Sequence, residues 1–162
     1  MTTERVPKPT AMIVSGYFSP LHCGHLDMIE EAAAGSDHLI VIVNNNAQQI
    51  MKKGKLIIDE QDRLRIVKAL GVVDEAMIAV DEDRTVSASL AVIAQQHPEF
   101  DLKFANGGDR QPDYVPEKGV CDEYGIEMVF AMGGNEKRDS SSRINVELGL
   151  EDEPSAPPST ST

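Results

Sequence analysis

Several common signatures are missing from this chain of 162 residues. It has only two cysteines, Cys23 and Cys121, and they form no CxxC pair, so we expect reduced thiols rather than a disulfide framework. No apolar run reaches the length of a membrane span and no signal segment opens the chain, which predicts a cytoplasmic protein that does not bind membranes. The two commonest phosphate-binding loops, GxGxxG and GxxxxGK, are also absent.

Basic residues are scarce. Lysine and arginine total 15 against 27 acidic residues, and the net charge of -12 argues against a nucleic-acid partner, since binding a phosphate backbone requires a basic face. The basic residues nevertheless gather in three segments, where they can supply local positive charge for a smaller anion. The clustered residues are Lys52, Lys53, Lys55, Arg110, Lys137, Arg138 and Arg143.

Apolar runs alternate with helical patterns along the chain. The expected strands are Ala11–Ser15, Leu39–Val43, Ala76–Val80, Leu102–Ala105 and Glu127–Phe130. The expected helices are His25–Ala34, Glu60–Leu70, Val86–Gln96, Pro116–Tyr124 and Ser141–Leu148. This alternation predicts an α/β fold, a Rossmann-like three-layer α/β/α domain with a five-stranded parallel sheet. We place the domain at residues 9–149, with a disordered N-terminus at 1–8 and a disordered acidic, Pro/Ser/Thr-rich tail at 150–162.

The most informative segment is the decapeptide GYFSPLHCGH, residues 16–25, at the first expected strand-to-helix crossover. A helix N-terminus there favours an anion, so a phosphate group would be held by backbone N–H groups and the helix dipole. His22 and His25, spaced i and i+3, can lie on the same side of the first turn and donate to one phosphate. Two alternatives remain, a metal half-site and plain capping residues. Zinc would need further ligands, and His38 and His97 lack ligand-like spacing.

This decapeptide resembles the GTFDPxHxGH signature of the HxGH nucleotidyltransferase superfamily, the cytidylyltransferase-like enzymes. Tyr17 replaces the usual small hydroxyl residue and Ser19 replaces the usual aspartate, and the resemblance extends over about residues 11–148. It implies that both histidines are catalytic. It also implies a nucleotide-binding role for a set of motif residues, namely Gly16, Tyr17, Phe18 and Gly24.

Three later segments fall where the superfamily has ligand-binding residues. In the segment after the second expected strand, Lys53 or Lys55 is the best match to a catalytic lysine that contacts phosphate, followed by Arg63. The loop after the fourth expected strand resembles a Gly-Gly-Asp element that contributes to nucleotide or acceptor binding, and the Ser-rich start of the last helix resembles a segment that binds the distal phosphates. The nucleotide-binding residues implied there are Gly108, Asp109, Arg110, Ser140, Ser141, Ser142 and Arg143.

The resemblance implies an enzyme that transfers a nucleoside monophosphate from ATP or CTP to a small phosphorylated acceptor and releases pyrophosphate. Its order of features is most similar to the sugar-phosphate branch, such as heptose 1-phosphate adenylyltransferase and glycerol-phosphate cytidylyltransferase. Mg²⁺ would be bound through the nucleotide phosphates with no metal site made of side chains, and the enzyme would be a homodimer. The alternative is a nucleotide-binding regulatory or assembly protein with the same fold and no turnover.

Overall fold

A computed structural model of the chain describes residues 7–107, 115–132 and 147–148. The strands are β1 (Thr10–Gly16), β2 (His38–Val43), β3 (Glu75–Ile78), β4 (Asp101–Gly107) and β5 (Glu127–Met132). The helices are α1 (Cys23–Ala34), α2 (Asn46–Lys53), α3 (Glu60–Lys68), α4 (Ser87–Gln96) and α5 (Lys118–Tyr124). Within these described residues, no helix combines the length and apolarity needed to cross a membrane.

All five strands are parallel, in the order β3-β2-β1-β4-β5. The chain adds β2 and β3 on one side of β1 and then returns to the other side with β4 and β5, so the order reverses between β1 and β4. In open α/β sheets, ligands bind outside the carboxyl ends of the strands at this reversal. The loop that follows β1 there is residues 17–22, which with Gly16 and the first turn of α1 make up the decapeptide.

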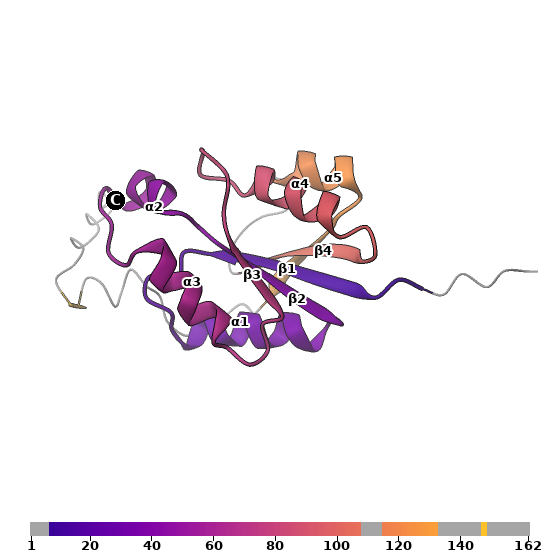
Figure 1. The fold of residues 1–162 in the computed structure, drawn as a ribbon, viewed down its shortest axis with the longest axis horizontal. Coiled ribbons are helices and arrows are strands. Elements are labelled where there is room, and N and C mark those ends of the chain that lie inside the picture. The colour runs from indigo at the N-terminus through magenta and orange to yellow at the C-terminus, as the bar shows by residue number, and fades with distance from the viewer. Residues whose placement is uncertain (1–6, 108–114, 133–146, 149–162) are drawn as a thin grey trace, which may run out of the picture.

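Helices cover both faces of the sheet (Figure 1). On one face, α4 and α5 pack over an apolar cluster that includes Ile40, Leu90 and Phe104. On the other face, α1 and α3 enclose a second cluster around Val41 and Ile29. Because β2 is covered on both sides, its last five residues are all buried, as expected for a central parallel strand. The expected three-layer α/β/α arrangement with five parallel strands is therefore confirmed.

The expected elements agree with the described ones within about two residues at most ends, with one clear error. No helix was expected between the strand Leu39–Val43 and the helix Glu60–Leu70, but α2 occupies Asn46–Lys53 and lies off the carboxyl ends of the strands (Figure 1). Its ends carry recognisable signals, because Asn45 and Gln48 form a capping box and Gly54 closes the helix at φ 78°. The expected helix Ser141–Leu148 lies almost entirely outside the described residues.

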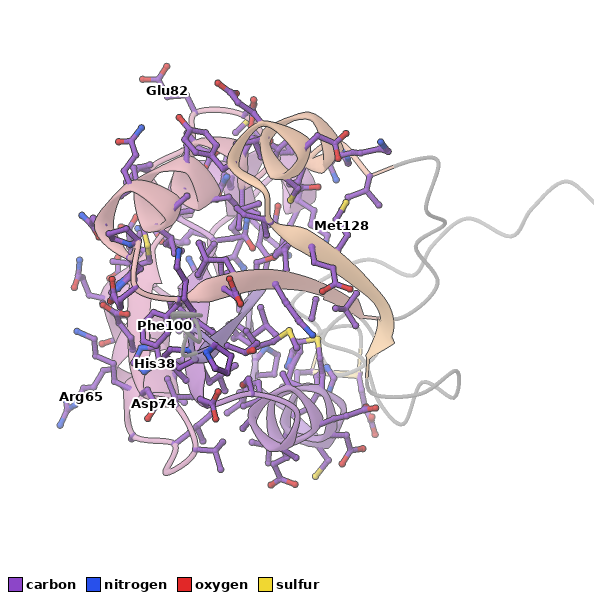
Figure 2. All side chains as sticks on the ribbon, turned by 90° about the vertical axis from the view of Figure 1, so that its right-hand side faces the viewer. His38, Arg65, Asp74, Glu82, Phe100 and Met128 are labelled. Atoms are coloured by element: carbon purple, nitrogen blue, oxygen red, sulfur yellow. The ribbon has the colours of Figure 1, made fainter. Side chains whose placement is uncertain are left out.

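The amino ends of the strands carry a separate cluster of histidines and acids. His38 stacks on Phe100 with ring centroids 4.8 Å apart, and Figure 2 shows these two side chains beside Asp74. Glu75 accepts from both histidines of the cluster, at 3.3 Å from His38 Nε2 and 3.1 Å from His97 Nε2. This cluster lies at the opposite end of the sheet from the decapeptide. A substitution of one of its histidines can therefore serve as a control for a substitution of a motif histidine.

Candidate functional site

The turn that leaves β1 depends on a glycine and a buried aromatic ring. Phe18 adopts a left-handed backbone conformation at φ 50° and is only 2% exposed. Its ring lies over Gly16, where an added Cβ would come within 2.8 Å of Phe18 Cζ. The same ring meets His25 edge-on, with centroids 5.0 Å apart. Gly16 and Phe18 therefore fix the path of the turn and support one of the two motif histidines.

Both motif histidines cap helix α1 through their Nδ1 atoms. His22 is the N-cap residue, and its Nδ1 accepts from the Gly24 N–H at 3.1 Å. His25 Nδ1 in turn accepts from the His22 N–H at 3.3 Å, which completes a capping box. A neutral imidazole that accepts at Nδ1 carries its proton on Nε2, so both rings have an Nε2–H donor.

The two rings stack, with centroids 3.8 Å apart and planes 26° from parallel. Stacking places the two imidazoles face to face at the N-terminus of α1, where the helix dipole also favours an anion. Capping is therefore compatible with ligand binding, because capping uses Nδ1 and not the Nε2–H group. Gly24 uses its own N–H in the cap.

Arg63, expected third in line to contact phosphate, is fully buried and braces the loops instead. Its Nη1 donates to the carbonyl oxygens of Tyr17, at 2.9 Å, and Asn44. Its Nε donates to the carbonyl oxygen of Ile58 at 2.8 Å, and its Nη2 donates to Asn46 Oδ1 at 3.2 Å. Burial lowers the pKa of Arg63 from its ordinary value, and nearby acidic residues oppose that effect. The guanidinium thus joins α3 to the loops that follow β1 and β2.

Helix α2 carries two buried glutamines that sequence analysis missed. Gln48 Oε1 accepts from the Asn45 N–H at 2.9 Å, and its Nε2 donates to the backbone oxygens of Asp83 and Thr85. Gln49 Nε2 donates to Ser19 Oγ at 2.8 Å, with both side chains buried. The Asn-x-x-Gln spacing of the capping box was the available signal for this helix. Its buried face ties α2 to the decapeptide.

The lysines of this segment differ in their relation to the motif. Lys52 Nζ lies 4.3 Å from the centroid of the Tyr17 ring, within the range of a cation–π interaction. Lys53 is half-buried in the last turn of α2, and Lys55 is exposed after Gly54. The structure thus places a third lysine, which sequence analysis had not selected, directly against a motif residue.

Seven expected nucleotide-binding residues fall outside the described part of the chain. They are Gly108, Asp109, Arg110, Ser140, Ser141, Ser142 and Arg143. β4 carries the chain to Gly107 at the carboxyl edge of the sheet, next to β1, which is where the fourth loop was expected to begin.

The described side chains of the site are suited to bind an anion. They offer imidazole Nε2–H groups and lysine ammonium groups, which donate to phosphate oxygens. In the described ranges, no group of three or more His, Cys, Asp or Glu side chains is arranged to hold a metal ion.

The relatives found by sequence comparison include proteins of two kinds. The bifunctional protein HldE of Syntrophotalea carbinolica is 29% identical over 148 residues, which are 89% of this chain and 29% of that protein. The HldE of Geobacter metallireducens is 31% identical over 81% of this chain and 26% of that protein. An FAD synthase of Methanosarcina barkeri is 38% identical over 46% of this chain and 52% of that protein. The chain thus spans between about a quarter and a half of the length of these relatives.

Two known structures share the fold. The lipopolysaccharide core biosynthesis protein of Thermoplasma volcanium has a TM-score of 0.60 at 23% identity, over 81% of this chain and 99% of that chain. A putative nicotinate-nucleotide adenylyltransferase of Vibrio parahaemolyticus has a TM-score of 0.58 at 18% identity, over 88% of this chain and 89% of that chain. At these identities the likeness concerns the fold alone.

The family profile described as cytidylyltransferase-like matches residues 13–150 and so covers most of the chain, including the decapeptide. This match agrees with the resemblance seen in the decapeptide and with the sheet order. The protein belongs to the cytidylyltransferase-like family of nucleotidyltransferases.

Proposed function

We propose that this protein transfers a nucleoside monophosphate from ATP or CTP to a small phosphorylated acceptor. A phosphate oxygen of the acceptor forms a bond to the α-phosphorus, the bond between that phosphorus and the bridging oxygen breaks, and pyrophosphate leaves with the bond's electron pair. No covalent intermediate with the protein is needed. Negative charge grows on the transferring phosphoryl oxygens and on the leaving group, and groups that stabilise this charge lower the barrier.

The observation that carries the proposal is the pair of stacked motif histidines. Because the Nδ1 atoms of His22 and His25 are occupied by backbone N–H groups, each neutral ring offers Nε2–H as a donor. The capping box holds these donors in place before a ligand arrives, so little reorganisation is needed when charge develops. The N-terminus of α1 adds a favourable dipole for the same phosphate.

Lysines in the last turn of α2 and just after it are proposed to supply the positive charge. Lys53 and Lys55 were selected from the sequence, and Lys52 joins them because its ammonium group lies against Tyr17 of the motif. A lysine ammonium acts as a compact charge with three donors, which suits contact with triphosphate or acceptor phosphate oxygens.

A magnesium ion fits this site if it is bound through the phosphates of the nucleotide. The donors that the described residues bring to the site are N–H groups, which bind phosphate oxygens and not a cation, so the triphosphate would hold the ion. When bound, Mg²⁺ would offset part of the negative charge of the phosphates. The protein residues would bind and orient the phosphates.

The acceptor is proposed to be a sugar, polyol or aminoalcohol phosphate. The similarity to HldE proteins covers four-fifths or more of this chain and supports the branch indicated by the order of sequence features. The similarity to FAD synthases covers less than half of it, and for that reason flavin mononucleotide belongs in the same test as a further phosphorylated acceptor.

The test is magnesium-dependent pyrophosphate release with ATP or CTP against a panel of these acceptors. We expect release with one nucleotide and acceptor pair, its loss in His25→Ala, and its retention in His38→Ala, a histidine at the opposite end of the sheet. Circular dichroism would verify that both variants fold. Nucleotide binding without release for any acceptor would instead favour the non-catalytic alternative, and full activity of His25→Ala would contradict the mechanism.

A further inference from the structure

The two positions at which the decapeptide departs from the family signature are both contacted by α2. Tyr17 replaces a small hydroxyl residue, and Lys52 Nζ lies 4.3 Å from the centroid of its ring. Ser19 replaces an aspartate and accepts from Gln49 Nε2 at 2.8 Å. Gln49 and Lys52 are spaced i and i+3, so they lie on one face of α2. The unusual residues of the motif are therefore matched by one surface of the next helix.

The Ser19 contact sets the distance between α2 and the motif loop. Gln49 is 1% exposed and Ser19 is 3% exposed, so their hydrogen bond lies in the interior and holds the helix at a defined position. One turn later, the side chain of Lys52 leaves this anchored helix and passes over the Tyr17 ring. The position of the Lys52 ammonium thus depends on two contacts with the motif loop.

The backbone of Tyr17 is also held in place. Its carbonyl oxygen accepts from the buried Arg63 guanidinium at 2.9 Å, which restrains the backbone that carries the ring. A lysine side chain has four flexible bonds, and ordering it at the moment of ligand binding reduces affinity. An aromatic face on a fixed backbone restricts the ammonium in advance, whereas the small residue of the family signature offers no such face.

We propose that Tyr17 is a positioning residue that holds the Lys52 ammonium over the motif loop for contact with phosphate oxygens. The inference rests on the proposed function for its ligand, either the triphosphate or the acceptor phosphate. Tyr17 acts through its ring and not through its hydroxyl group. Its effect on ligand binding therefore requires Lys52 to be present.

The experiment is a double-mutant cycle with Tyr17→Leu, Lys52→Met and the combined variant. Isothermal titration calorimetry gives the affinity for magnesium-ATP and magnesium-CTP, and pyrophosphate release gives KM for the acceptor and kcat. We expect Lys52→Met to weaken one of these ligands about tenfold or more. We expect Tyr17→Leu to weaken the same ligand about two- to fivefold, mainly through Kd or KM, and to have no further effect in the Lys52→Met protein.

Conservative and remote variants complete the design. Tyr17→Phe keeps the ring and should bind like the unchanged protein, while Tyr124→Leu and Lys68→Met replace the same residue types on α5 and α3. The proposal is overturned if Tyr17→Phe loses as much as Tyr17→Leu, if the two substitutions are additive, or if Lys52→Met binds every ligand normally. Absence of pyrophosphate release in the unchanged protein would refute the proposed function, and the calorimetric cycle would still decide the role of Tyr17.

Discussion

Replacing Arg63 by methionine should destabilise the protein strongly, because a buried cation that holds two loops is lost. Methionine has a similar length and fills part of the space, but it donates no hydrogen bonds. The carbonyl oxygens of Tyr17, Asn44 and Ile58 then lose their side-chain donor. A hydrogen bond to a charged group contributes about 1.5–3 kcal/mol. Since the three share one side chain and are not additive, we expect a total loss of about 3–5 kcal/mol.

Urea denaturation followed by circular dichroism would measure this loss as a lower free energy of unfolding. Arg65→Met is the matched control, because Arg65 lies on the exposed side of the same helix. A decrease of less than about 1 kcal/mol for Arg63→Met, within the range of ordinary surface substitutions, would refute the bracing role. A loss of turnover with unchanged stability would instead restore Arg63 as a ligand-contacting residue.

Three further predictions concern other parts of the fold. Gly16→Ala should lower the free energy of unfolding in urea by about 1–3 kcal/mol, since the added Cβ would meet the Phe18 ring at 2.8 Å, and an unchanged value would refute this contact. The pKa of His97 is raised, first by its hydrogen bond to Glu99, so the stabilisation is present below pH 6.5 and is lost as the pH rises through the raised pKa. The free energy of unfolding should therefore fall between pH 6 and pH 8.5, and it should fall by less in Glu99→Gln. An equal fall in both proteins would count against the ion pair. Burial raises the pKa of Cys121 to about 11, so Ellman's reagent at pH 8 should titrate one thiol in the native protein and both after denaturation, and a native count of two would be the contrary result.

Residues close in sequence carried most of what could be predicted about the motif. His22 and His25 are three residues apart, so the spacing alone was enough to expect both rings on one turn, and the structure brings them to stacking distance. Their tautomer was not predictable, because it depends on which backbone N–H each Nδ1 accepts. The distinction matters for the chemistry, since it identifies Nε2 as the donor atom.

The region after β2 shows where sequence reasoning was insufficient. Its helix was missed because the polar residues Asn44 to Gln49 have the composition of a loop, although Asn45 and Gln48 had the spacing of a capping box. Gln48 is buried because its Nε2 donates to the backbone oxygens of Asp83 and Thr85, 35 and 37 residues away. Gln49 is buried with its Nε2 donating to Ser19 Oγ, 30 residues away, so these are distant partners too. Secondary-structure propensity reflects the polar side chains of the segment but not their distant hydrogen-bond partners.

The sequence by itself determined the fold class and the parallel sheet, and it predicted an anion site at the first crossover. These follow from periodicity and from short spacings, both of which are local properties of the chain. Only the tertiary structure decided the role of Arg63 and the contact between Lys52 and Tyr17. Arg63 reaches a carbonyl oxygen 46 residues earlier, and Lys52 reaches a ring on the loop of another strand. Such contacts depend on how β1, β2 and the following helices come together, because the sheet brings residues distant in sequence to one edge.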